Sequence, residues 1–156
     1  MVDGLARRVA LLESRVAIRE LVMGYCMAID DRDIDALEAM FCEDVLFGHA
    51  DGSLEKHGRD EVVAFYRGSL SLLGPTYHYP HSQAITFDDA KNARGTVLAH
   101  AELARDGETI QVALRYKDCY RNEEGSWRFA SRYLQIIYFM TLGELATGRL
   151  NEPLRK

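Results

Sequence analysis

Four long segments of strand-like sequence follow one another in the second half of this chain, separated only by short turns. The turns at 88–92, 105–108 and 122–125 are rich in Asp, Asn and Gly, and the segments between them carry many β-branched and aromatic residues. Strands joined by such short turns pair as antiparallel neighbours. We therefore predict a four-stranded meander over Tyr77–Phe87, Gly95–Leu103, Thr109–Tyr120 and Trp127–Phe139.

The first half of the chain has helical periodicity instead. Apolar residues recur every three or four positions over Leu5–Ile29, and shorter helices fit Asp33–Phe41, with Asp33 as the N-cap, and Asp60–Leu72. Val45–Phe47 has the pattern of a strand. Helices followed by an antiparallel sheet define an α+β domain, and we expect a single domain over residues 1–156 with a ligand cavity between the helices and a curved sheet.

Composition excludes several classes of function. The chain has a net charge of −5 and no basic stripe, which argues against binding to nucleic acid or to an anionic membrane surface. No apolar run approaches the roughly 18 residues that a membrane span requires, and the first residues lack the apolar core of a signal peptide. We therefore expect a cytoplasmic protein with no membrane partner.

Metal and disulfide chemistry are not indicated. The three cysteines are odd in number and widely spread, so neither a disulfide framework nor a zinc site follows from their spacing. His78, His81 and His100 lie on neighbouring predicted strands, but their expected directions do not converge on one point. We expect no metal and no cofactor.

Two polar residues interrupt apolar patterns where a site could form. Asp30 follows the apolar stripe of the first helix, and its alternative role is to end that helix or cap the next turn. His78 lies on the first strand of the meander, and a carboxylate on one ring nitrogen would raise the basicity of the other. His81 points away from His78 under strict alternation, unless a bulge near Pro80 reverses it.

Alternation also sorts the other candidates. Tyr116 shares the apolar face of its strand, and Tyr138 and Arg132 share one face of the last strand. An internal salt bridge is the alternative for Arg132. Tyr25 precedes Asp30 by five residues, or about 140° around an ideal helix, so both can face one cavity only if the helix ends there. A buried core tyrosine is the alternative for Tyr25.

The order and spacing of these residues resemble the SnoaL-like group of the nuclear-transport-factor-2-like superfamily, which includes cofactor-free dehydratases, isomerases and cyclases. The pattern Leu-x-x-Arg-x-Ala-Ile-x-x-Leu within Leu12–Asp30 is similar to the first helix of lindane dehydrochlorinase, and Tyr25 with Asp30 is similar to the pair in bile-acid dehydratases. His78-x-x-His81 has the spacing of the histidine strand in those enzymes and in scytalone dehydratase. Gly95 and the Gly125-x-Trp127 hairpin complete the resemblance.

The resemblance implies a cone-shaped α+β barrel, with N-terminal helices packed on a curved antiparallel sheet. It places Asp30 and His78 on the family's catalytic aspartate and histidine, and Tyr25 on an active-site tyrosine. His49 falls where relatives hold a cavity tyrosine. The expected site is therefore catalytic Asp30, His78 and Tyr25, with substrate bound by His49, Tyr116, Arg132, Tyr138 and His81.

The function we expect is that of a cofactor-independent lyase of the dehydratase type, or an isomerase, acting on a small, largely apolar cyclic or polycyclic compound. His78 would take a C–H proton while Asp30 stabilises the imidazolium. Ala101 and Leu103 stand where the dehydratases hold a further polar residue, which leaves the exact reaction open. Two alternatives remain: Asp30 as the direct base, as in ketosteroid isomerases, and a non-catalytic ligand-binding or assembly domain resembling the small subunit of ring-hydroxylating dioxygenases.

The C-terminal segment 139–156 continues the last apolar strand past the expected core. Because exposed apolar residues there would form an unfavourable patch, we expect Phe139–Leu150 to close the cavity as a lid or to pack on a neighbouring subunit, and Asn151–Lys156 to be a polar tail. The resemblance also implies a homo-oligomer, either a trimer or a dimer.

Overall fold

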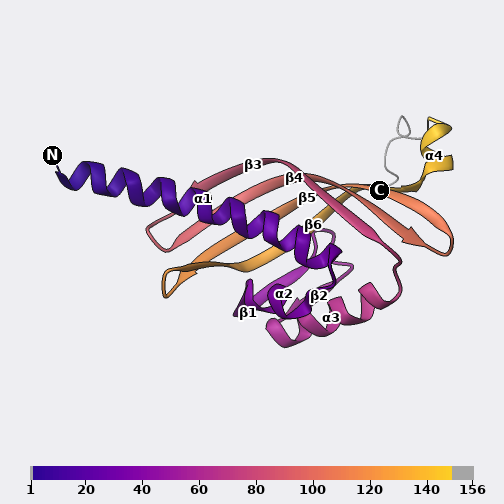
Figure 1. Cartoon of the computed structure of the whole chain (residues 1–156), viewed down its shortest axis with the longest axis horizontal. Helices are drawn as coiled ribbons and strands as arrows, with labels where there is room; N and C mark the ends of the chain where they lie inside the picture. Colours follow the sequence, from indigo (N-terminus) through magenta and orange to yellow (C-terminus); the bar gives the residue numbers. More distant parts are fainter. Residues whose placement is uncertain (1, 149–156) are drawn as a thin grey trace.

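The computed structural model describes residues 2–148 and has the predicted α+β architecture, with helices against a curved, unclosed sheet (Figure 1). The predicted tail Asn151–Lys156 and the end of the proposed lid lie outside the described residues. The elements in chain order are α1 (Val2–Asp30), α2 (Ile34–Ala39), β1 (Phe41–His49), β2 (Glu55–His57), α3 (Arg59–Ser71), β3 (Thr76–Phe87), β4 (Asn92–Arg105), β5 (Glu108–Glu123), β6 (Ser126–Thr141) and α4 (Leu142–Ala146).

The sheet has the strand order β2-β1-β6-β5-β4-β3. The four predicted strands form the antiparallel meander β3 to β6, and each is between one and five residues longer than expected. β1 pairs with β6 in parallel, so the last strand of the chain joins the meander to the N-terminal hairpin. The short strand β2 and the short helix α4 were not predicted, because three and five residues are too few to show a period.

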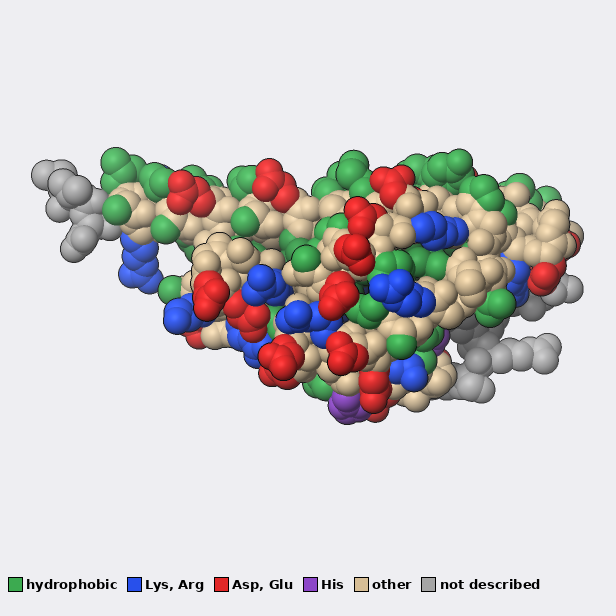
Figure 2. Space-filling model, turned by 60° about the horizontal axis from the view of Figure 1, so that its bottom comes forward, with side chains coloured by type: hydrophobic (Ala, Val, Ile, Leu, Met, Phe, Trp, Pro, Cys, Tyr) green, Lys and Arg blue, Asp and Glu red, His purple; other side chains and the backbone are tan. Residues whose placement is uncertain are grey.

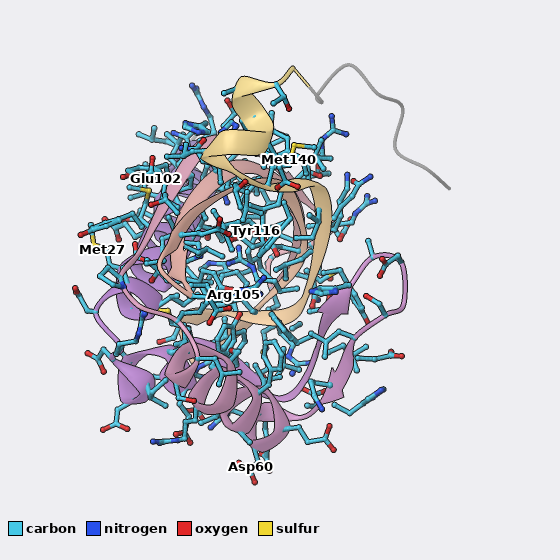
Figure 3. All side chains as sticks on the ribbon, turned by 90° about the vertical axis from the view of Figure 1, so that its right-hand side faces the viewer. Met27, Asp60, Glu102, Arg105, Tyr116 and Met140 are labelled. Carbon is cyan, nitrogen blue, oxygen red and sulfur yellow. The ribbon has the colours of Figure 1, made fainter. Side chains whose placement is uncertain are left out.

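The helices cover the concave face of the sheet, and the core lies between them. α1 contributes Ile18, Val22 and Ile29, which are at most 3% exposed, and α3 contributes Val62 and Leu70. Figure 3 shows Tyr116 inside the curl of the sheet and Met27 and Glu102 outside it. The alternation predicted for β4 and β5 is thus correct: apolar side chains face inward, and His100 and Glu102 face outward.

The junction after α1 is fixed by polar contacts. Arg32 adopts a positive φ of 61° and reverses the chain, and its guanidinium donates to the Ile29 carbonyl at 2.8 Å and to Thr76 Oγ1 at 2.7 Å. Asp33 caps α2 as predicted, since its side chain accepts from the Ala36 amide at 2.9 Å. The end of α1 is thereby attached to the start of β3.

Three irregularities in strand pairing decide which way several candidate side chains point. One lies between Pro80 and Ser82 in β3, and two lie where β5 pairs with β6. An extra residue in one strand reverses the direction of the side chains beyond it. Because of the irregularity opposite Ala113 and Leu114, Phe139 faces the interior and Tyr138 does not. The expected inward direction of Tyr138 is thus corrected.

Any side chain at Gly95 of β4 should destabilise the fold, because a Cβ there would lie 2.9 Å from the Ala84 carbonyl oxygen and 2.9 Å from the ring of Tyr120. We expect Gly95→Ala to lower the free energy of unfolding by about 1–3 kcal/mol through this overpacking. Gly68→Ala is the matched control: it lies in α3 with open space around it, and should raise stability by about 0.5–1 kcal/mol. Urea unfolding of both variants measures the difference, and equal effects would contradict the expectation.

Candidate active site

A cavity of about 210 Å³ lies between the concave face of the sheet and helices α1 and α3. Its wall is mainly apolar, with a few polar groups, as in small-molecule sites. His78 and His49 enter it from β3 and β1, and Phe139 bounds it near the end of β6. The remaining lining residues are Tyr25, Ile29, Phe47, Phe65, Tyr66, Ser69, Leu70, Leu73, Thr76, Ala101, Leu103, Val112, Leu114, Tyr116, Leu134 and Ile136.

Asp30 and His78 are in contact at one wall of this cavity. His78 Nδ1 lies 2.6 Å from Asp30 Oδ1, and the His78 backbone amide donates to Asp30 Oδ2 at 2.8 Å. Thr76 donates to Asp30 Oδ1 at 3.0 Å. Both side chains are largely buried, with 12% of His78 and 20% of Asp30 exposed. The carboxylate therefore holds one nitrogen of the ring, which leaves Nε2 for the cavity.

The environment keeps Asp30 charged. Burial acts to raise the pKa of its carboxyl, but the hydrogen bonds from the His78 ring and backbone and from Thr76 outweigh burial and hold the pKa below its usual value. An ionised carboxylate at this distance accepts the Nδ1 proton and fixes the tautomer in which Nε2 is unprotonated. This arrangement suits a histidine that takes up a proton at Nε2.

Tyr25 and Tyr66 form a second polar group in the cavity wall. Their hydroxyls hydrogen-bond to each other, joining α1 to α3, and both residues are at most 5% exposed. Burial raises the pKa of Tyr25 to about 12, with Arg132 acting in the opposite direction, and burial raises the pKa of Tyr66 well above its usual value. Both phenols therefore remain protonated near neutral pH and can donate hydrogen bonds.

Arg132 lies in the core beside the cavity and not among the residues that line it. It is fully buried, and its Nε and Nη2 donate to the two oxygens of Asp118 at 2.9 and 2.7 Å. The rings of Tyr25, Tyr116 and Phe129 surround the guanidinium at 4.0–4.1 Å. The internal salt bridge is therefore what the structure shows, and the expectation that Arg132 contacts substrate directly is corrected.

The other candidates divide between the two faces of the sheet. Tyr116 and His49 line the cavity, and His49 Nδ1 also lies 2.9 Å from Ser53 Oγ. His81 lies outside, because the irregularity next to Pro80 does not turn it inward. Its Nε2 lies 2.8 Å from His100 Nδ1. The expectation that His81 contacts substrate is corrected on this ground, and the Tyr138 ring lies near His100 on the same outer face.

A different group of possible metal ligands lies outside the cavity lining. Within the described residues, Cys42, Asp44 and Glu123 have ligand atoms within 4.8 Å of one another. Arg121 forms ion pairs with both carboxylates, and Arg128 pairs with Glu123. The two guanidinium groups already neutralise the carboxylates, so we interpret the group as an ion-pair network.

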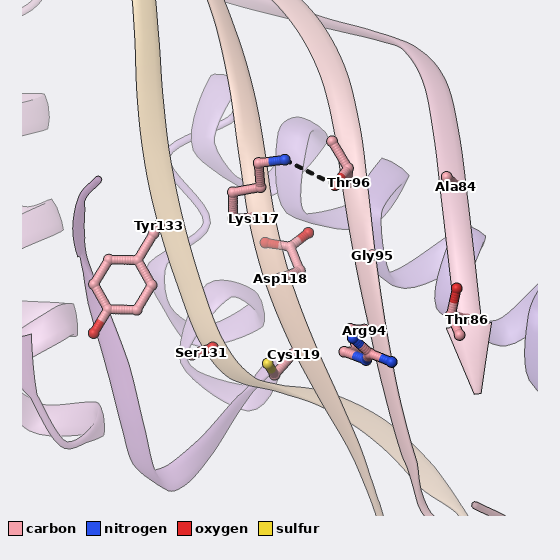
Figure 4. A pocket seen from close by; sticks show the side chains of 10 residues that line it. All are labelled: Ala84, Thr86, Arg94, Gly95, Thr96, Lys117, Asp118, Cys119, Ser131 and Tyr133. Atoms are coloured by element: carbon pink, nitrogen blue, oxygen red, sulfur yellow. Dashed lines mark hydrogen bonds between the residues drawn. The ribbon is translucent and has the colours of Figure 1, made fainter. Parts of the chain in front are cut away.

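A larger hollow of about 490 Å³ lies on the outer face of the sheet (Figure 4). Thr96, Lys117 and Tyr133 project into it from three adjacent strands, and Lys117 Nζ donates to Thr96 Oγ1 at 3.3 Å. It is open to solvent and contains no paired acid and base. The cavity on the concave face is therefore the better candidate for chemistry.

The comparisons with known proteins assign a family. The model of the SnoaL-like domain matches residues 10–133. The chain belongs to this family. No curated protein matches the sequence significantly. Within the described residues, no helix has the length and apolarity that crossing a membrane requires.

Solved structures show the same fold at low identity. A hexachlorocyclohexane dehydrochlorinase (LinA type 2) superposes with a TM-score of 0.80 and 22% identity, over 86% of this chain and 93% of that one. A protein from Novosphingobium aromaticivorans, provisionally named a scytalone dehydratase, gives 0.79 and 22%, over 90% and 91%. An NTF2-like protein with a cystatin-like fold from the same organism gives 0.72 and 22%, over 98% of both chains.

Three residues of the site environment were not found from the sequence. Tyr66 lies on the buried face of α3, at the helical spacing from Val62 and Leu70 that any core residue there would have. Thr76 and Asp118 lie on strands, and their hydrogen-bond partners belong to other elements of the fold. The sequence alone does not identify those partners. An Asp in an otherwise apolar inward row of β5 was the one available signal for Asp118.

Removing the charge of Asp118 should destabilise the protein strongly. Asp118→Asn would leave the Arg132 guanidinium buried without its counter-ion, and we expect a loss of about 3–5 kcal/mol in the free energy of unfolding. Asp88→Asn is the control, since it removes an exposed ion pair to Arg94 and should cost less than about 1 kcal/mol. Denaturant unfolding distinguishes the two, and a small loss in Asp118→Asn would show that the pair contributes little.

Proposed function

We propose that this SnoaL-like protein is a cofactor-independent lyase of the dehydratase type, or an isomerase, that acts on a small, largely apolar cyclic compound. The observation that carries the proposal is the 2.6 Å contact between Asp30 and His78 at the wall of an apolar cavity. The fold likeness to a dehydrochlorinase and to a provisionally named scytalone dehydratase supports this reaction class. The substrate is expected to be small, since the cavity holds about 210 Å³.

His78 is the better candidate for the base than Asp30. His78 lines the cavity, whereas Asp30 does not, and both oxygens of Asp30 are engaged by the chain itself. A proton taken from substrate would therefore go to Nε2 of His78, and Asp30 would stabilise the resulting imidazolium. This geometry disfavours the alternative in which Asp30 abstracts the proton directly.

The elimination balances without any further reactant. Nε2 takes a proton from a ring carbon, the C–H electron pair forms a carbon–carbon double bond, and a leaving group departs from the adjacent carbon with its bonding pair. A chloride ion leaves unaided, whereas a hydroxyl group needs a proton to leave as water. In an isomerisation, the imidazolium instead returns the proton to another carbon of the same substrate.

The phenol pair is the candidate source of that second proton. Tyr25 and Tyr66 are buried, protonated and placed in the cavity wall, so either can donate to a hydroxyl or to a carbonyl oxygen. A donor fixed in a dry cavity stabilises developing negative charge more than water does. We assign Tyr25 this role, with Tyr66 holding its hydroxyl in place.

Replacing either member of the dyad should remove most of the turnover while leaving the fold intact. We expect His78→Asn and Asp30→Asn to reduce the rate by about 10²–10⁴-fold, the usual contribution of a general base. The assay is a panel of hexachlorocyclohexanes and cyclic β-hydroxyketones, read as chloride release and as absorbance of the new double bond. Deuterium uptake by cyclic ketones in D₂O reports proton abstraction alone.

Matched controls exist for both changes. His81→Asn replaces a histidine of the same strand that lies outside the cavity, and Asp31→Asn replaces an exposed carboxylate beside Asp30. Both controls should retain full activity. If His78→Asn keeps its activity and Asp30→Asn does not, Asp30 is the base. If wild type neither turns over nor exchanges any compound that binds, the domain serves binding or assembly.

Tyr25→Phe should separate two kinds of leaving group. Because a hydroxyl must be protonated to leave and a chloride need not be, we expect dehydration to slow by about 10²-fold and dehydrochlorination to change little. Tyr79→Phe, on an exposed tyrosine of β3, is the control and should change neither rate. Equal loss of both reactions would indicate that Tyr25 positions the substrate and does not protonate it.

A further inference from the structure

Helix α1 extends well beyond the sheet that its C-terminal half covers (Figure 1). Packing against the domain begins near Arg15, which donates to the Ile85 carbonyl at 3.3 Å and lies over the ring of Phe87. The preceding turns project for about 18 Å at 1.5 Å per residue. Figure 2 shows this projection with apolar side chains along it. Nothing within the described residues covers them.

Four of the exposed apolar residues of this projection form one stripe. Leu5, Val9, Leu12 and Val16 are separated by four, three and four residues and are 64%, 44%, 62% and 52% exposed. That spacing is the alternation of positions a and d in a heptad repeat, with Val at a and Leu at d. The stripe lies on the opposite side of the helix from Ile18, which is fully buried against the sheet. It is therefore not a continuation of the domain core.

The residue types on the stripe favour one kind of partner. β-branched residues at a combined with Leu at d favour two parallel strands in a coiled coil. The identical stripe of a second copy supplies this combination. A helix that is already held by a folded domain at one end needs less additional stabilisation than an isolated peptide of the same length.

The charges beside the stripe are complementary between two parallel copies. Arg8 lies at position g on one flank and Glu13 at position e on the other, and neither has an ion-pair partner within the described residues. In a parallel pair, position g of one helix lies next to position e of the following heptad in its partner. The two helices would therefore form two equivalent Arg8–Glu13 contacts. An antiparallel pair of residues 4–16 would instead bring Arg8 next to Arg15 of its partner, and Glu13 next to Ala6.

We propose that two copies of this chain associate through the projecting part of α1, residues 4–16, as a parallel two-stranded coiled coil. The stripe is the contact surface, and the Arg8–Glu13 pairs set the orientation. This association lies outside the catalytic cavity and does not depend on the reaction proposed for it. It places the two domains at the same end of the paired helices, each on the outer side of its own helix.

The first test measures the mass of the full-length protein by sedimentation or by light scattering coupled to size exclusion. Leu5→Glu/Leu12→Glu places charges at both d positions and should halve the mass of the wild-type particle. Leu11→Glu is the matched control, because Leu11 is 45% exposed on the same projection but lies outside the stripe. It should leave the mass unchanged. Circular dichroism of each variant verifies that the fold is retained.

The second test determines orientation. Arg8→Glu and Glu13→Arg should each raise the dissociation constant several-fold, and the double exchange should restore the wild-type value, since it recreates both pairs. Leu5→Cys in a Cys119→Ser background should form an intermolecular disulfide readily on oxidation, because d positions face each other in a parallel pair. Leu11→Cys in the same background should not.

The outcomes separate the alternatives. A monomeric wild type, or a mass that Leu5→Glu/Leu12→Glu leaves unchanged, overturns the proposal and moves any association to another surface. A threefold mass that the same double variant reduces to one third overturns the two-stranded form. Tighter association in Arg8→Glu overturns the parallel orientation.

Discussion

The end of α1 is fixed to the start of β3 by a small set of polar contacts, and the position of the cavity depends on it. Asp30 accepts from the backbone and the ring of His78, and Arg32 donates to Thr76 and to the Ile29 carbonyl. The same carboxylate therefore joins the two elements and orients the imidazole. A shift of the helix along the sheet would break both functions at once, which couples the integrity of the fold to the chemistry of the site.

A second constraint lies deeper in the core. The Arg132 guanidinium is enclosed by three aromatic rings and neutralised by Asp118, which also accepts from the Tyr120 hydroxyl at 2.7 Å. Two of those rings, Tyr25 and Tyr116, line the cavity on their other side. The buried cation thus acts on the cavity through aromatic side chains, and it opposes the effect of burial on the pKa of the Tyr25 phenol.

The sequence predicted the parts of the structure that depend on local periodicity. The helix ending at Asp30, the cap at Asp33 and the inward row that contains Tyr116 all follow from spacing and residue type. The sequence left the direction of His81 open and gave the wrong direction for Tyr138. One extra residue in a strand reverses the direction of all side chains beyond it, and the amino-acid composition does not reveal where such a residue lies. The pairing of Arg132 with Asp118 depends on strand register, which a single chain pattern does not specify.

The contact between the two phenols has a consequence for the shape of any ligand. Tyr25 and Tyr66 carry one hydroxyl hydrogen each, and their mutual hydrogen bond uses one of the two. The pair therefore presents a single hydrogen to the cavity. A ligand with one acceptor atom at that position satisfies the pair, whereas a second acceptor there would receive no hydrogen from the pair unless the hydrogen bond between the two phenols broke. This part of the cavity thus selects by the number of acceptor atoms as well as by size.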